Sequence, residues 1–183
     1  MYYENYDIST TAWIMVVLDD DKVDLSTFAA MRKKFGTQAH TANILGLTDG
    51  VIISKFENGK AKIDKRTYSL FLLVSNNHPY YTMELKADAE DKTEDKTVVF
   101  EPPSGEGIKI MREYAGLSQG RLAFLLGMMS NEKPNRQLIS RYEKGVQNPS
   151  AQTWTLFLLI TGQHPNYEIF PKSDINFDEL NQE

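Results

Sequence analysis

Hydrophobic residues recur at the three-to-four-residue spacing of amphipathic helices in two stretches of the chain. In the later stretch, Ser118 and Asn135 are suitable N-caps, and Gly127 and Gly145 are typical C-terminal stops. The later stretch therefore predicts helices over residues 107–115, 119–126 and 136–144 and a fourth helix that carries residues 154–160. The earlier stretch follows the same order and predicts helices over residues 25–35, 38–45, 50–56 and 65–75.

Alternating residues outside the helices predict short strands. Residues 80–85 alternate between hydrophobic and polar, and residues 97–101 do so in part. Residues 86–96 between them are highly charged, so they form either a flexible linker or the loop of a hairpin whose strands are the two flanks. The β-rich composition of both flanks favours the hairpin. Residues 167–170 and 13–18 are further candidates for strands.

One motif occurs twice at a fixed offset. Residues 53–59 (Ile-Ser-Lys-Phe-Glu-Asn-Gly) correspond to residues 139–145 (Ile-Ser-Arg-Tyr-Glu-Lys-Gly), 86 positions later. Between residues 53–83 and 139–169, 12 of 31 positions are identical without a gap. An offset of this kind indicates two copies of one folding unit, so whatever the unit does decides most of the function.

The later copy carries an insertion. Between the glycine that ends its second helix and the repeated motif, it has five more residues than the earlier copy. They fall within residues 128–134, and Pro134 disfavours helix immediately before it. We therefore expect a looped-out turn that leaves the third helix intact, with Asn131 and Lys133 as candidate further contacts.

Charge is segregated along the chain. The net charge is −5, which would argue against a nucleic-acid partner if the chain were uniform. Residues 22–79, however, carry nine Lys/Arg against four Asp/Glu, and residues 107–165 carry seven against three. Each copy thus has a net positive charge although the rest of the chain is acidic, which favours contact with phosphates. The alternative is that these charges only solvate the outer faces of the helices.

Composition excludes several classes of protein. The absence of cysteine excludes disulfides, thiol nucleophiles and thiolate zinc sites. No apolar run approaches the roughly 20 residues that span a bilayer, and no signal peptide is visible. The 183 residues, 41% of them hydrophobic, suit two small domains with a core each. We expect a cytoplasmic protein without a membrane segment.

The sequence lacks the motifs of common enzymes. It contains neither a glycine-rich phosphate loop nor a nucleophile elbow. His78 and His164 each precede a proline after a predicted helix, which is explained most simply as a helix stop. Because neither histidine has an acidic cluster near it in sequence, a metal site is not expected. We therefore expect no catalytic residues, no metal and no cofactor.

The later copy resembles a known family. Its residues Leu117-Ser118-Gln119 and Leu126-Gly127, its run over residues 136–145 and its turn over residues 148–150 are similar to the bacteriophage-repressor helix-turn-helix family, also called the xenobiotic-response-element type. The resemblance covers residues 107–165, and it covers residues 24–79 more weakly through Gln38, Leu45-Gly46 and residues 53–59.

The resemblance implies a mainly α fold with short β-strands, made of two tandem lambda-repressor-like helix-turn-helix domains. The expected division is an N-terminal arm and a degenerate domain over residues 1–85, an acidic hairpin loop or linker over 86–106, a DNA-reading domain over 107–171 and an acidic tail over 172–183. The breaker cluster at residues 101–105 marks the start of the second unit.

In this family the first turn of the third helix enters the major groove of DNA. Arginine can bind guanine, and glutamine can bind adenine, through two hydrogen bonds each. In the earlier copy Gly50 and Val51 stand where the later copy has arginine and glutamine, so the later copy is the expected reader. The expected base-reading residues are Arg136, Gln137, Ser140 and Arg141. The expected phosphate contacts are Gln119, Lys144, Asn148, Gln38, Lys55, Lys60, Lys62 and Lys65. Two structural ion pairs are expected, Arg112 with Glu143 and Arg32 with Glu57.

These features predict a sequence-specific DNA-binding transcriptional regulator of bacterial or phage type, a repressor acting at a promoter of a phage or mobile element. Its expected partner is double-stranded DNA, which a homodimer would contact at an inverted repeat; a covalent pseudo-dimer within one chain is the other arrangement. The alternative function is a protein-interaction module, such as an antitoxin or inhibitor subunit, that holds a protein partner through residues 24–85.

Overall fold

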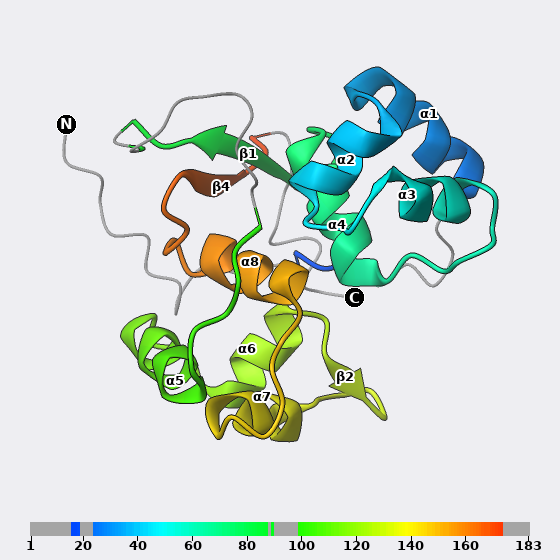
Figure 1. Cartoon of the computed structure of the whole chain (residues 1–183). Coiled ribbons are helices and arrows are strands. Elements are labelled where there is room, and N and C mark those ends of the chain that lie inside the picture. Colours follow the sequence, from blue (N-terminus) through cyan, green and yellow to red (C-terminus); the bar gives the residue numbers. More distant parts are fainter. Residues whose placement is uncertain (1–15, 19–23, 88, 90–98, 174–183) are drawn as a thin grey trace.

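The computed structural model describes residues 16–18, 24–87, 89 and 99–173, which are mainly helical with a few short strands (Figure 1). The earlier copy comprises α1 (Leu25–Phe35), α2 (Gln38–Ile44), α3 (Gly50–Glu57), α4 (Lys65–Val74) and β1 (Tyr81–Leu85). The later copy comprises α5 (Gly105–Tyr114), α6 (Gln119–Leu125), β2 (Met129–Ser130), β3 (Lys133–Pro134), α7 (Arg136–Glu143), α8 (Ala151–Ile160) and β4 (Tyr167–Pro171). None of the helices in these residues is long and apolar enough to cross a membrane.

The predicted caps set the ends of the helices. The Ser118 hydroxyl accepts a hydrogen bond from the backbone N–H of Arg121, and the Asn135 side chain accepts one from the N–H of Leu138. Gly127 follows α6 with a φ of 61°, the left-handed conformation that glycine adopts without steric cost. These local signals explain why the helices form where the sequence predicted them, to within two residues for all but the fourth helix of the later copy, which begins three residues before the predicted stretch.

The strand pairing differs from the predicted hairpin. β1 pairs antiparallel with β4, and residues 99–101 form no strand; residues 97 and 98 lie outside the described part. The backbone N–H of Phe100 donates to the Thr155 hydroxyl on α8 at 2.9 Å, so it is not available to β1. Residues 16–18 are not a strand either, and the rest of that candidate, residues 13–15, is not described. The predicted strand over residues 167–170 is confirmed as β4.

The insertion in the later copy is a small hairpin rather than an irregular loop. β2 pairs with β3, and the two residues between them, Asn131 and Glu132, have φ of 48° and 63°. Two consecutive left-handed residues form the tight turn whose twist matches that of paired strands. The N–H of Asn135 then donates to the Met128 carbonyl at 2.7 Å, which closes the hairpin against the start of α7.

The two copies are related by an internal twofold axis. In the β1–β4 pair Met83 lies opposite Ile169, its own counterpart 86 positions later. Thr82 lies opposite Phe170 and Glu84 opposite Glu168, so exchanging the copies maps one pair onto the other. This register places a dyad through the centre of the sheet. The repeat predicted from the sequence is therefore arranged like the two halves of a symmetric dimer.

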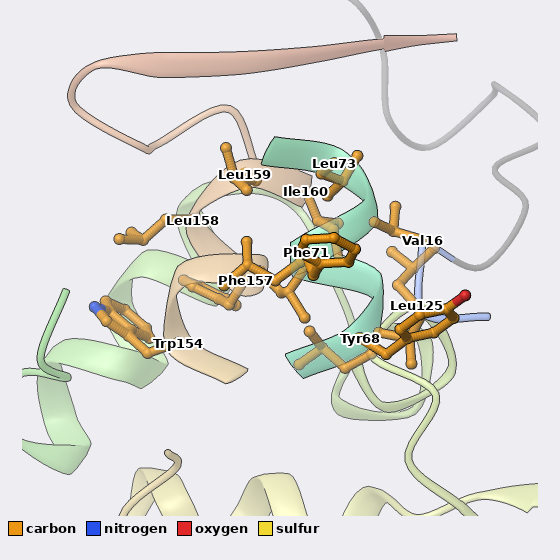
Figure 2. Packing of buried hydrophobic residues seen from close by; sticks show 14 of the residues in the cluster. Val16, Tyr68, Phe71, Leu73, Leu125, Trp154, Phe157, Leu158, Leu159 and Ile160 are labelled. Carbon is orange, nitrogen blue, oxygen red and sulfur yellow. The ribbon is translucent and has the colours of Figure 1, made fainter. Parts of the chain in front are cut away.

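The dyad also relates α4 to α8. The two helices pack against each other, and Figure 2 shows Phe71 and Ile160 between them. Both helices are buried nearly all round along most of their length, as expected for helices packed between two layers. The sequence predicted a core for each domain; the buried residues instead form one cluster that spans both copies.

Reciprocal contacts join each copy to the turn of the other. A Cβ placed on Gly127 would lie 2.8 Å from Val17 Cγ1, and a Cβ on Gly46 would lie 2.7 Å from Val99 Cγ1. Val17 precedes the earlier copy and Val99 precedes the later one, so each leading segment packs against the glycine turn of the opposite copy. The amide of Gln152 adds a hydrogen bond across the dyad to the Leu45 carbonyl, at 2.9 Å.

Candidate nucleic-acid interface

The candidate reading surface is the outer side of α7. Ile139 and Tyr142 are buried beneath it, which orients the helix. Residues four apart on a helix are neighbours, so Arg136 with Ser140 and Gln137 with Arg141 form two adjacent rows on the side opposite to the buried residues. Arg136, Gln137 and Arg141 are exposed there and Ser140 is half-buried. The structure thus brings the four predicted base-reading residues together on one accessible surface. The arginines make no ion pair with any residue in the described ranges.

A buried ion pair holds α7 in place. Arg112 Nε of α5 donates to Glu143 Oε1 at 2.5 Å, and its Nη1 donates to the Leu117 carbonyl. The two side chains are 9% and 6% exposed. The hydrogen bond that Arg112 donates to Glu143 is the largest cause that raises the pKa of the Arg112 guanidinium above its ordinary value. A charge pair buried at this depth fixes the angle between α5 and α7, which confirms the predicted structural pairing.

The earlier copy repeats this arrangement. Arg32 Nε donates to Glu57 Oε1 at 2.6 Å, and its Nη1 donates to the Gly36 carbonyl at 3.0 Å. Burial raises the pKa of the Glu57 carboxyl, but the hydrogen bonds from Arg32 and Gln38 outweigh burial and leave the pKa below its ordinary value. The second predicted ion pair is thus also confirmed.

The two glutamines predicted to contact phosphates take part in the same networks. Gln38 Nε2 donates to Glu57 Oε2 at 2.6 Å, and Gln119 Nε2 donates to Glu143 Oε2 at 2.8 Å. Each amide nitrogen carries two hydrogens, so one hydrogen remains for an outside acceptor. The glutamines therefore stabilise the glutamate of their own third helix, and a phosphate contact stays a prediction that uses the second hydrogen.

The first turn of α3 is unlike that of α7 for a steric reason. A Cβ on Gly50 would lie 3.0 Å from the backbone nitrogen of Ala39 and 3.2 Å from its Cα, so a side chain there would crowd the backbone of α2. The next residue, Val51, is 58% exposed and carries no hydrogen-bonding group. Asp49 caps the helix by accepting from the N–H groups of Val51 and Ile52. This surface offers an apolar contact where α7 offers an arginine and a glutamine.

The remaining predicted phosphate contacts differ in their exposure. In the earlier copy Lys65 is half-buried and has an interaction within the protein. The others are exposed: Lys55, Lys60 and Lys62 in the earlier copy, and Lys144 and Asn148 in the later copy.

The two histidines have a structural role that the sequence did not reveal. His78 is fully buried; its Nε2 donates to the Val16 carbonyl at 2.9 Å, and its Nδ1 accepts from the N–H groups of Tyr80 and Tyr81. Burial lowers the pKa of His78 to about 4. His164 Nδ1 accepts from the equivalent N–H groups in the later copy. The histidines therefore shape the turns into β1 and β4 rather than merely ending helices.

Some hydrophobic residues are exposed away from α7. On α5, Ile110 is 58% and Tyr114 is 85% exposed, one turn apart on the side opposite the buried Arg112. Val146, after α7, is 65% exposed. These side chains are a second candidate surface, suited to an apolar protein partner rather than to DNA.

Within the residues that the structure describes, no three or more His, Asp or Glu side chains gather as metal ligands. Comparisons with models of protein families, with curated proteins and with solved structures each found no match. The function is therefore inferred from the residues and their geometry.

Proposed function

We propose that the protein is a sequence-specific DNA-binding transcriptional regulator with two tandem helix-turn-helix units of the bacteriophage-repressor type. The observation that supports this most is the outer side of α7, where Arg136, Gln137 and Arg141 are exposed above a buried ion pair. Donors on a rigid helix that make no ion pair with the described residues suit the edges of bases in a major groove, because no such pair has to break before binding.

Each residue of this surface has a distinct role in the proposal. Arg136 donates two hydrogen bonds to a guanine, and Gln137 forms a donor–acceptor pair with an adenine. Ser140 and Arg141 extend the contact by one helical turn. Lys144 and Asn148 follow the helix and contact the phosphate backbone, which positions α7 without reading sequence.

The earlier copy contributes affinity more than sequence preference. Lys55, Lys60 and Lys62 are exposed and can neutralise phosphates. Val51 offers contact with a thymine methyl group and no hydrogen bond. Bound at a promoter in the cytoplasm, such a protein would repress transcription by excluding the polymerase.

Selection of bound fragments from random DNA tests the proposal. A defined sequence should be enriched, and Arg136→Ala and Gln137→Ala should each weaken binding to it by roughly 1–3 kcal/mol and relax preference at one base pair. Lys172→Ala is the matched control, because Lys172 follows β4, away from α7. Failure to enrich any sequence, together with binding that does not change with salt, would reject the proposal.

A second function is favoured by the exposed hydrophobic residues. A protein-interaction module, such as an antitoxin or inhibitor subunit, would use Val51 on α3 or Ile110 and Tyr114 on α5 to hold its partner. Val51→Asp and Tyr114→Ser would then abolish binding of the protein partner, while Arg136→Ala would leave that binding unchanged. Loss of function with Arg136→Ala and not with Val51→Asp or Tyr114→Ser would support DNA binding instead.

A further inference from the structure

We propose that one chain binds one asymmetric DNA site with both copies at once, reading bases through α7 in one half and holding the backbone through the earlier copy in the other. This inference rests on the proposed function and specifies its target. It also replaces the homodimer expected from the sequence, because the second helix-turn-helix unit is supplied by the same chain.

The internal dyad supplies the geometry. A twofold axis relates any feature to its counterpart at the same height along the axis, so α3 and α7 lie at one level on opposite sides of it. In Figure 1 the β1–β4 ribbon lies at one end of the molecule, and α3 and α7 flank the other end. A symmetric repressor dimer likewise relates its two reading helices by a twofold axis, and these contact successive major grooves about one DNA turn, roughly 34 Å, apart.

The relation between the two copies is rigid. It is held by the β1–β4 pairing, by the shared core of α4 and α8 and by the hydrogen bond from Gln152 to the Leu45 carbonyl. The contacts of Val17 with Gly127 and of Val99 with Gly46 also cross between copies. A shared core cannot stretch or rotate as a flexible linker can, so the spacing between the two contacted grooves is fixed.

The two copies differ in the chemistry that they present. At the first turn of the third helix the later copy has Arg136 and Gln137, whereas the earlier copy has Gly50 and Val51. The β2–β3 hairpin occurs beside α7 and has no counterpart beside α3, where residues 45–49 connect α2 to α3 directly. Two copies that are related by a twofold axis but present different side chains match a DNA site whose two halves differ in sequence.

The experiment uses the full chain and a labelled duplex of the sequence enriched by selection. Mass measurement of the complex should give one chain per duplex, and a footprint should cover two successive grooves with base preference in only one. Inserting five base pairs between the halves should lower affinity at least tenfold. Inserting ten should not restore it, because the rigid chain cannot reach one further DNA turn.

The double variant Lys60→Ala/Lys62→Ala should reduce the slope of log affinity against log salt by about two and remove protection from the non-preferred half. Lys172→Ala should change neither. Two chains on a palindromic sequence, or a footprint confined to the α7 half, would overturn the inference while leaving the proposed function standing. The absence of any preferred sequence would overturn the proposed function itself.

Discussion

Replacing Gly127 by alanine tests the reciprocal contact between the two copies. Gly127 has a φ of 61°, and holding alanine in this left-handed conformation costs about 1–2 kcal/mol. The new Cβ would also lie 2.8 Å from Cγ1 and 3.0 Å from Cβ of Val17, closer than Cβ atoms pack in proteins. Because Val17 is fully buried, relieving this overlap costs roughly a further 1–3 kcal/mol. We expect a total destabilisation of about 2–5 kcal/mol.

Gly116→Ala is the matched control. Gly116 has a φ of 67° and therefore the same backbone cost, but no atom lies within 4 Å of its Cβ position. The free energy of unfolding, measured by urea denaturation of each variant, should fall by about 1–2 kcal/mol for Gly116→Ala. The difference between the two variants isolates the contact between the copies.

The double variant Gly127→Ala/Val17→Ala sharpens the test. Removing the two methyl groups of Val17 makes room for the new Cβ, so the double variant should be more stable than the sum of the single changes predicts. Equal destabilisation by Gly127→Ala and Gly116→Ala, or strict additivity in the double variant, would refute the crossed packing of the leading segment on the opposite copy.

Three other outcomes follow from the structure. His78 has a pKa of about 4 in the folded protein against 6.5 when unfolded, so the stability that depends on its neutral form is fully present above pH 6.5 and is lost as pH falls toward 4. The loss in the free energy of unfolding amounts to up to about 3 kcal/mol. Urea denaturation of His78→Gln should therefore show a weaker pH dependence over this range. The lowered pKa of Glu57 contributes stability above its unfolded value of 4.5 that is lost as pH falls, and Glu57→Gln should remove that acid-range loss. Glu143→Gln should cost about 3–5 kcal/mol in thermal or urea unfolding, because it leaves the buried Arg112 guanidinium with only the exposed Glu113 carboxylate as a counter-charge, whereas a change below 1 kcal/mol would contradict a stabilising pair.

The helices were predictable because their signals are local. α1 begins and ends at the residues that the pattern predicts, where Asp24 caps its start and Gly36 follows its end. Ser118 and Asn135 cap α6 and α7 as predicted. A cap, a hydrophobic stripe and a stopping glycine all lie within one or two turns of chain, so their spacing in sequence carries the information.

The strand pairing was not predictable from local composition. The β-rich composition of residues 80–85 and 97–101 favoured a hairpin between them, which would also have the lower sequence separation. β1 instead pairs with β4 across the dyad. The offset of 86 positions did contain a usable signal, because it maps residues 81–85 onto residues 167–171, and equivalent strands at a twofold axis can pair with each other.

The candidate site was predictable only in part. The spacing of Arg136, Gln137 and Arg141 relative to the buried face of α7 indicated their exposure, which the structure confirms. The reason for Gly50 was not visible, because the backbone of Ala39 that a side chain would crowd belongs to a different helix. The engagement of Gln119 by Glu143 likewise depends on the approach of α6 to α7. Contacts between elements require the fold, whereas exposure along one helix requires only its periodicity.

The two copies share the residues of their common core and differ in the exposed first turns of their third helices. Leu70 to Leu73 in α4 are identical to their counterparts in α8 and are buried in the shared core. Both copies must present this surface, because each forms the other's core. The exposed first turns of α3 and α7 carry no such constraint, and there the earlier copy has Gly50 and Val51 where the later copy has an arginine and a glutamine. A symmetric target would require the same side chains at both places. The identity of these core residues, together with the difference between the exposed first turns, supports the proposed asymmetric DNA site.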